Sequence, residues 1–150
     1  MLQRSGPAQV EIDGRISGTI KSGLVVLIAF AATDTETELA WMVNKLVNLR
    51  IFTDDQDKMN LSLKDVGGGI LLVSQFTLYG NCNKGMRPSF IGSAPPDVAR
   101  DMYDRFGHLL RQQWPTVGEG EFGASMNVSL TNQGPVTLII DRDHPCEGKK

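Results

Sequence analysis

Two uninterrupted apolar runs, Leu24–Phe30 and Ile70–Val73, dominate the pattern of hydrophobic and polar positions along the chain. A strand with one face in water alternates apolar and polar side chains, so a continuous run of large residues predicts a strand buried on both faces. We therefore expect both runs at the centre of a β-sheet. The second run ends in Ser74, Gln75 and Thr77. These polar side chains should lie at the rim of the sheet, where ligand sites tend to occur.

Two other segments carry apolar residues at steps of three and four, which is the spacing of an amphipathic helix. The first begins near Thr35, which has the spacing of a capping box with Glu38, and is predicted to end near Arg50. The second follows a Pro-Pro pair, with Ser93 as a candidate N-cap, and ends before Pro115. Both helices are predicted to pack on the sheet.

The remaining apolar segments are short or alternate with polar residues, as in strands nearer a sheet edge. Asp13-Gly14 is a strong hairpin signal, and Asn132-Gln133-Gly134-Pro135 is expected to form a turn. The further strands are predicted within residues 8–20 as a hairpin, and at 51–52, 60–63, 117–122, 126–130 and 136–140. The pattern predicts a mixed α/β (α+β) fold, in which a curved mixed sheet or half-barrel carries two main helices. We expect a single domain over residues 1–150, of which 141–150 form a mobile tail.

Length, composition and charge limit the class of protein. The chain has 150 residues, 41% hydrophobic and 21% charged, which is typical of one globular domain. Its apolar runs are too short to cross a membrane and no secretory leader pattern opens it, so we expect a cytoplasmic protein with no membrane partner. A formal charge of −2 argues against binding DNA or RNA through bulk electrostatics. A local patch would have to hold any RNA, with Lys84, Arg87 and Lys149-Lys150 as candidates.

Few residues are available for metal or nucleophilic chemistry. The only histidines are His108 and His144, which is little material for a metal site or a Ser-His-Asp triad, and we predict neither metal nor cofactor. Cys82 and Cys146 are predicted to be reduced thiols. Because no histidine stands in a recognisable partner context, Cys82 is expected to be a small buried thiol rather than a nucleophile.

Two polar motifs remain, each at a predicted strand end. One is Ser74-Gln75-Phe76-Thr77, and the other is Gly134-Pro135 with Thr137. From the residues alone, each motif is equally well an ordinary border of a sheet or part of a functional site. The Gly-Pro bond is also a candidate for the cis form, which is a proline phenomenon.

These motifs resemble the two signatures of the D-aminoacyl-tRNA deacylases of the common bacterial and eukaryotic type. Ser74-Gln75-Phe76-Thr77-Leu78 is similar to the first signature, and Asn132-Gln133-Gly134-Pro135-Val136-Thr137 to the second. Further similar blocks follow in the family's order at residues 2–4, 50–52, 58–61 and 85–90. The resemblance implies hydrolysis of the ester bond of D-aminoacyl-tRNA, and of mischarged glycyl-tRNA, as translation proofreading. It also implies tRNA as a partner and a homodimer with active sites at its interface.

The resemblance assigns the second motif to substrate selection. Gly134 and Pro135 of one subunit would enter the active site of the other as a Gly-cisPro filter that rejects L-aminoacyl-tRNA. A glycine without Cβ can stand close to the substrate α-carbon and exclude an L-side chain sterically. Arg4 resembles an early arginine of the family that braces this segment, and Thr137 would support it.

The resemblance assigns the first motif to binding and chemistry. Ser74, Gln75 and Phe76 would shape the substrate pocket, and the backbone N–H groups of Phe76 and Thr77 would hold the oxyanion. Thr77 is the nucleophile suggested by residue type, but no base stands beside it. The resemblance favours attack by water, assisted by the 2′-hydroxyl of the RNA.

Three other interpretations stay open at this point. A sibling class removes L-alanine from tRNA, but its first signature has proline where this chain has Ser74. A non-catalytic module could bind an RNA end or small ligand in the same pocket. A Thr77-dependent esterase for small D-amino esters is the third.

Overall fold

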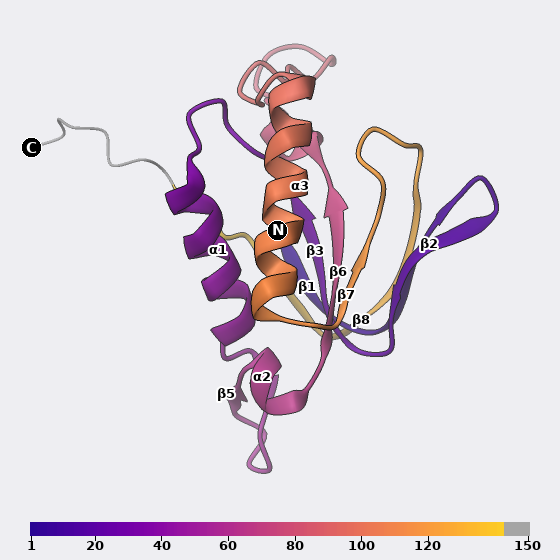
Figure 1. Ribbon diagram of the computed structural model, residues 1–150, viewed down its shortest axis with the longest axis vertical. Coiled ribbons are helices and arrows are strands. Elements are labelled where there is room, and N and C mark those ends of the chain that lie inside the picture. The colour runs from indigo at the N-terminus through magenta and orange to yellow at the C-terminus, as the bar shows by residue number, and fades with distance from the viewer. Residues whose placement is uncertain (143–150) are drawn as a thin grey trace, which may run out of the picture.

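The computed structural model describes residues 1–142 and contains a strongly curved mixed sheet with two long helices on one face (Figure 1). The main sheet has the order β2-β1-β3-β6-β7, with β8 on the free edge of β1, and β4 pairs with β5 separately. The strands are β1 (Leu2–Ile12), β2 (Arg15–Ile20), β3 (Gly23–Ile28), β4 (Phe52–Thr53), β5 (Met59–Leu61), β6 (Gly69–Ser74), β7 (Val117–Glu119) and β8 (Asn127–Leu138). The helices are α1 (Glu36–Asn48), α2 (Leu63–Val66), α3 (Pro96–Gln113) and the 3₁₀ helix η1 (Phe76–Tyr79).

The two apolar runs form the central strands β3 and β6, as predicted, and these two strands pair in parallel. Leu24 is paired with Ile70 at one end, and Ile28 with Ser74 at the other. Alternate side chains of both strands are buried on opposite faces of the sheet, where two apolar clusters form. The cluster under the helices contains Leu24, Val26, Ile70, Leu72, Val43, Leu46, Phe106 and Leu110. The cluster on the other face contains Val10, Ile20, Val25, Leu71 and Val73.

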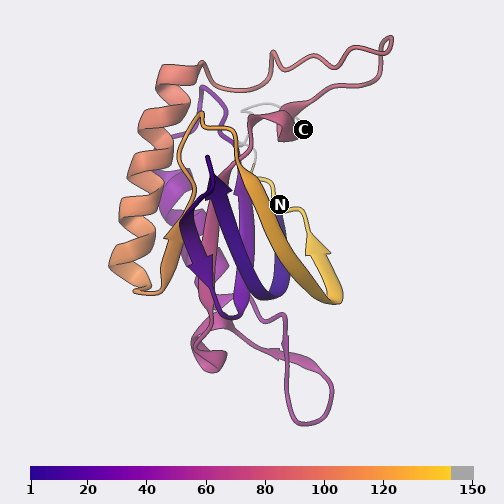
Figure 2. The same ribbon diagram turned by 90° about the vertical axis from the view of Figure 1, so that its right-hand side faces the viewer.

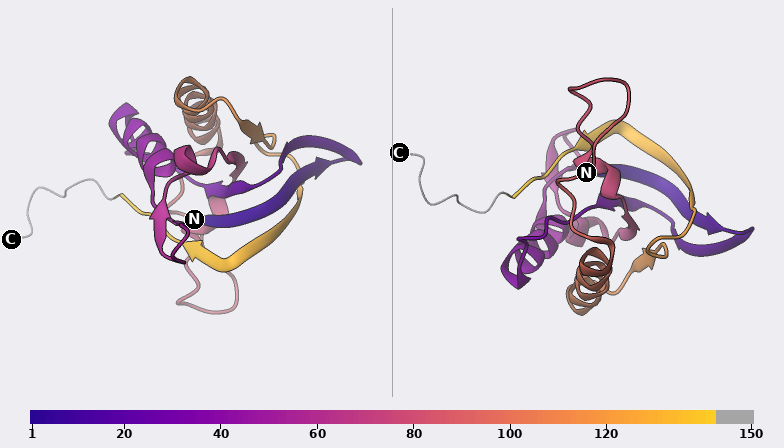
Figure 3. Two further views of the ribbon diagram at one scale, coloured as in Figure 1. Left: turned by 90° about the horizontal axis from the view of Figure 1, so that it is seen from below. Right: turned by 90° about the horizontal axis from the view of Figure 1, so that it is seen from above.

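A bend in β1 closes the sheet into a barrel-like shape. Residues Leu2–Ser5 pair with β3 and Ala8–Ile12 pair with β2, while β8 follows the opposite edge of β1 through the bend (Figure 2). Seen along the barrel, β8 passes over the side away from α1 and α3 (Figure 3). Between β2 and β7 the backbones meet so closely that a Cβ on Gly18 would lie 2.5 Å from the amide nitrogen of Glu119. The curved sheet with two main helices therefore confirms the predicted fold class.

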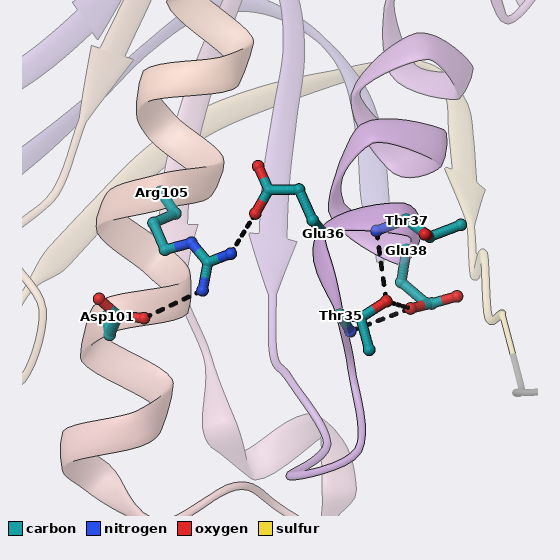
Figure 4. Close-up of polar contacts among 6 residues, drawn as sticks. All are labelled: Thr35, Glu36, Thr37, Glu38, Asp101 and Arg105. Carbon is teal, nitrogen blue, oxygen red and sulfur yellow. Dashed lines mark hydrogen bonds and ion pairs between the residues drawn. The ribbon is translucent and has the colours of Figure 1, made fainter.

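Capping and ion pairs hold the helices in place. Thr35 and Glu38 form the predicted capping box at the start of α1. Arg105 of α3 pairs with Glu36 of α1 and with Asp101 of its own helix (Figure 4). These exposed pairs contribute little individually. The buried Tyr103 joins α3 to the sheet, because its hydroxyl lies 3.0 Å from the carbonyl oxygen of Leu72, and burial raises the pKa of this phenol well above its usual value.

The structure corrects the prediction for the last part of the sheet. The expected strands 126–130 and 136–140 and the turn between them are one strand, β8, whose two halves both stay paired with β1. Residues 133–136 therefore form a bulge within β8, which bends together with β1, rather than a turn between two separate strands. The expected strand 117–122 is also shorter, since β7 ends at Glu119.

Three local predictions are also wrong. Residues 60–63 do not form one strand, because Ser62 and Asp65 make a capping box that starts the short helix α2. Ser93 does not cap α3: the N-cap is Pro95, which makes no side-chain hydrogen bond, and the Ser93 hydroxyl donates to the carbonyl of Ala94. Cys82 is exposed rather than buried, because its loop does not fold back onto the core.

The predicted tail is described only in part. Arg142 lies against α1, with its guanidinium 4.8 Å from the ring centre of Trp41 and 3.9 Å from the carboxylate of Glu38. Residues 143–150, which include His144 and Cys146, lie outside the described residues, so their predicted mobility and redox state stay predictions. Within residues 1–142, no helix combines the length and the apolar character needed to cross a bilayer.

Candidate active site

A pocket of about 650 Å³ opens where β3 and β6 end. Its volume lies within the range of about 300–1,000 Å³ that is usual for small-molecule sites. Ser74, Gln75 and Phe76 of the first motif line it, and most of the other walls are apolar. These walls come from the end of β3 and the residues just after it, the loop before α3, the start of α3, and the segment that leads into the start of β8: Ile28, Phe30, Phe90, Ile91, Pro95, Pro96, Phe122, Ala124, Met126 and Val128.

The polar end of β6 turns abruptly into the 3₁₀ helix η1. The Gln75 amide still donates to the carbonyl of Ile28, and the Gln75 side chain then donates to the hydroxyl of Thr77. Thr77 itself is exposed and does not line the pocket. Phe76 is 55% exposed and packs edge-to-face on Phe90, with ring centres 5.2 Å apart. The first motif is therefore held on the pocket rim by its own side chains and by one aromatic contact.

The start of η1 presents unpaired backbone donors. The first N–H groups of a helix have no partner within that helix. Among residues 1–142, the N–H groups of Phe76 and Thr77 have no hydrogen-bond acceptor, and Gln75 makes no side-chain cap. Donors of this kind can stabilise developing negative charge on an oxygen.

The pocket is uncharged. Its lining, within the part of the chain that the structure describes, contains no Asp, Glu, His, Lys, Arg, Cys or Tyr. Across residues 1–142 there is also no cluster of three potential metal-ligating His, Cys, Asp or Glu side chains. Side chains at this pocket can therefore orient a substrate through hydroxyl and amide groups, but none of them can act as a general base.

The second motif forms a bulge in β8. Asn132 is paired with Ser5 and Thr137 with Gln3, so residues 133–136 face only Arg4 on the neighbouring strand. The peptide bond between Gly134 and Pro135 is cis, and Gly134 has a φ of +127°. Residues with such φ values are almost always glycine. The bulge leaves Gly134 and Pro135 exposed.

Arg4 holds one side of this bulge. Its Nε donates to the carbonyl oxygen of Gln133 at 3.0 Å. Its Nη1 donates to the carbonyl of Ile51 at 2.8 Å and to the hydroxyl of Thr53 at 3.2 Å. The guanidinium thus ties the bulge to the segment around β4, using three fixed acceptors that a single ammonium group could not reach in the same geometry.

Side chains within β1 and β8 hold the other side of the bulge. The Asn132 side-chain oxygen accepts from the amide of Val136 at 2.8 Å, and its nitrogen donates to the Thr137 hydroxyl at 2.8 Å. Gln3 donates to the same hydroxyl at 3.2 Å. The Asn132 side chain therefore makes two hydrogen bonds to residues on the far side of the Gly-Pro pair. The Thr137 hydroxyl accepts two hydrogen bonds, one from Asn132 and one from Gln3.

A single chain does not bring the two motifs together. Arg4, beside the bulge, pairs with Leu24 of β3, and Leu24 pairs with Ile70 of β6. Ser74 lies four residues further along β6. At about 3.3 Å per residue, this separation is about 13 Å along the strand. Neither Gly134 nor Pro135 lines the pocket. Figure 2 shows the bend of β8 and the loop after β6 at opposite ends of the sheet.

Several residues of this arrangement had no individual role assigned from the sequence. Thr53, Asn132 and Gln3 make the contacts around the bulge, and Phe90 and Phe122 are pocket walls. The long loop without periodicity, residues 79–90, was the available signal for Phe90. The partners of Arg4 have no local signal, because they lie 47 or more residues away in the chain.

The sequence is similar to one enzyme family over nearly its whole length. The sequence model of D-Tyr-tRNA(Tyr) deacylases matches residues 1–141. A D-aminoacyl-tRNA deacylase of Fusobacterium nucleatum is 53% identical over 141 residues, covering 94% of this chain and 93% of that protein. One of Desulfatibacillum aliphaticivorans is 50% identical over 141 residues, covering 94% and 97%. The chain belongs to the D-aminoacyl-tRNA deacylase family. This confirms the family and the hydrolase class that the motifs indicated.

Solved structures agree with the deacylase fold. A c-Myc DNA unwinding element binding protein superposes with a TM-score of 0.89 at 36% identity, covering 95% of this chain and 97% of that one. A probable eukaryotic D-amino acid tRNA deacylase superposes with a TM-score of 0.77 at 23% identity, covering 89% and 93%. The second likeness shows the fold alone.

The Asn132 contacts of this deacylase can be tested by hydrogen exchange. Asn132→Ala removes the acceptor of the Val136 amide, and a hydrogen bond of about 1 kcal/mol corresponds to roughly fivefold faster exchange. We expect this acceleration at Val136 while the amides of β3 and β6 exchange as before. Ser129→Ala, on the same strand and without a side-chain hydrogen bond within residues 1–142, is the matched control. Unchanged exchange at Val136 would contradict the assignment.

Proposed function

We propose that this deacylase hydrolyses the ester bond of D-aminoacyl-tRNA, releasing free D-amino acid and tRNA, and that it acts as a homodimer. The main observation behind the proposal is that both family signatures are present and lie at different places in the fold. One lines an uncharged pocket, and the other projects from the opposite end of the sheet. An enzyme of charged tRNA would work in the cytoplasm, where translation takes place.

The separation of the motifs supports a site shared between two subunits. A Gly134-Pro135 segment cannot act on a substrate in the pocket of its own chain, because the length of β6 lies between them. In a twofold dimer, the bulge of one copy would reach the pocket of the other, and both sites would be completed by the same contact. The exposed bulge and the exposed side chains along β8 supply the surface for that contact.

The same segment would select the chirality of the substrate. Gly134 offers backbone without Cβ, so it can approach the α-carbon of the bound amino acid and leave no room for an L-side chain. A D-side chain would point away from it. Glycine has only a hydrogen atom where an L-amino acid has its side chain, and the filter has no means to exclude a hydrogen atom. Glycyl-tRNA would therefore also be hydrolysed.

The uncharged pocket favours water as the nucleophile. Water would attack the ester carbonyl carbon, the bond to the ribose oxygen would break, and the 2′-hydroxyl of the terminal adenosine would relay the proton. The N–H groups of Phe76 and Thr77 would hold the oxyanion. Ser74 and Gln75 would orient the substrate. This assignment needs no ionisable side chain, in keeping with the pocket lining.

A non-catalytic module that binds an RNA end is the main competing function, because the same uncharged pocket could hold a ligand without turnover. The sibling activity on L-alanyl-tRNA is less well supported, since this chain has Ser74 where the sibling signature has proline.

The function is tested with one tRNA charged in parallel with D- and L-tyrosine. We expect rapid loss of the D-ester while the L-ester decays at the rate seen without enzyme. Survival of both esters would leave the binding module as the better interpretation. Loss of both would overturn the chiral filter.

The filter is tested with Gly134→Ala. A Cβ here would lie 2.8 Å from Arg4 Nη2 and 2.8 Å from Val136 Cγ2, in a backbone conformation that alanine rarely adopts. We expect kcat/KM for D-tyrosyl-tRNA to fall at least about tenfold, since misplaced binding groups have effects of this size or larger. Gly14→Ala is the control, because Gly14 also has positive φ but open space around it. Equal activity of wild type and Gly134→Ala would refute the assignment.

The role of Thr77 is tested with Thr77→Ala and Thr77→Ser. If the backbone and the RNA supply the chemistry, Thr77→Ala should keep kcat within about tenfold of wild type, the effect of losing one orienting contact. Loss of about a thousandfold or more in Thr77→Ala, with rescue in Thr77→Ser, would instead indicate a threonine nucleophile. Single-turnover rates at saturating enzyme give the comparison directly.

A further inference from the structure

The loop of residues 81–91 projects from the body of the molecule next to the pocket (Figure 2). Asn81 and Ser89 exchange two backbone hydrogen bonds of 2.8 and 3.0 Å, which join the two arms of the loop. Phe90 and Ile91, which follow Ser89 in the chain, line the pocket. Met86 at the tip is fully exposed. The base of the loop is thus fixed to the pocket rim, while its tip lies in solvent.

The charge on this loop is of one sign. Lys84 and Arg87 are the only charged residues between Val66 and Pro96, in a chain whose formal net charge is −2. Both are exposed, and no carboxylate within residues 1–142 forms an ion pair with either. Cations gathered without neighbouring acids create a local positive potential that attracts an anionic ligand.

A third cation borders the same pocket. The guanidinium of Arg100, on α3, lies 5.0 Å from the ring centre of Phe122, which is a pocket wall. Arg100 has no ion pair among the described residues, and the nearby carboxylate of Asp101 is engaged by Arg105 at 3.3 Å. Arg100 thus places one cation beside a pocket wall, on a helix that also carries Asp97, Asp101 and Asp104.

We infer that the loop 81–91 binds the phosphate backbone near the 3′ end of the RNA, with Lys84 and Arg87 each contacting one phosphate. This inference rests on the proposed function, which puts the terminal adenosine and its ester in the pocket. The nucleotides that precede the terminal adenosine would then lie along the pocket rim, next to the loop. A second copy of this chain is the competing occupant, because Met86 and Ile91 are exposed and apolar. The uniform positive charge favours a polyanion.

The test compares substrates with and without phosphates. Lys84→Gln/Arg87→Gln should raise KM for D-tyrosyl-tRNA about tenfold with kcat unchanged, and reduce the slope of log KM against log salt by about 1.4, roughly 0.7 for each single-strand phosphate contact. Hydrolysis of 3′-D-tyrosyl-adenosine, which has no phosphate, should be unaffected. Lys84→Arg/Arg87→Lys should behave as wild type.

A control and a binding measurement complete the design. Lys21→Gln/Lys64→Gln makes the same charge change at exposed positions near the other end of β3 and β6, and should leave every parameter unchanged. Equal loss of activity on both substrates, or a smaller proportion of dimer in the loop variant, would overturn the inference. The loop would then contact the protein itself or a second copy of the chain. If wild type hydrolyses neither substrate, the proposed function has failed. Titration of uncharged tRNA then still decides the loop: equal affinity of wild type and variant would overturn it.

Discussion

The parallel pairing of β3 with β6 is the contact on which the rest of this molecule depends. Both strands are buried on both faces, so their register is fixed by two apolar clusters at once. That register places Ser74 opposite Ile28 at one sheet edge. The pocket forms there because the ladder stops and the chain turns into η1, which leaves polar side chains and backbone donors at the edge of an apolar interior.

The opposite end of the sheet depends on a different kind of interaction. Gly134 and Pro135 have no ladder hydrogen bonds to hold them, since four residues of β8 face one residue of β1. Their position is instead set by side chains, with Arg4 on one side and Asn132 on the other. A backbone segment fixed in this way can stay rigid while it is exposed. The proposed steric filter would require such rigidity, because a mobile segment would yield to the side chain that it should reject.

Sequence patterns predicted the parts of the structure that are governed by local or periodic rules. The central strands follow from continuous apolar runs, and the start of α1 follows from Thr35 and Glu38. Contacts between distant segments decide the rest. The residues around Gly134 have turn composition, yet pairing with β1 on both sides keeps them in one strand. Likewise, neither the exposure of Cys82 nor the partners of Arg4 could be derived from neighbouring residues.

The position of the two motifs connects the fold to its assembly. If both motifs were at one end of the sheet, a monomer could hold a complete site, and association would add nothing to specificity. With the motifs at opposite ends, the pocket of an isolated chain would have the proposed oxyanion donors but not the proposed chiral wall. Such a monomer would have no steric means to distinguish D- from L-esters. Selection against L-aminoacyl-tRNA would then depend on the dimer, so that only the assembled protein would spare the correctly charged tRNA.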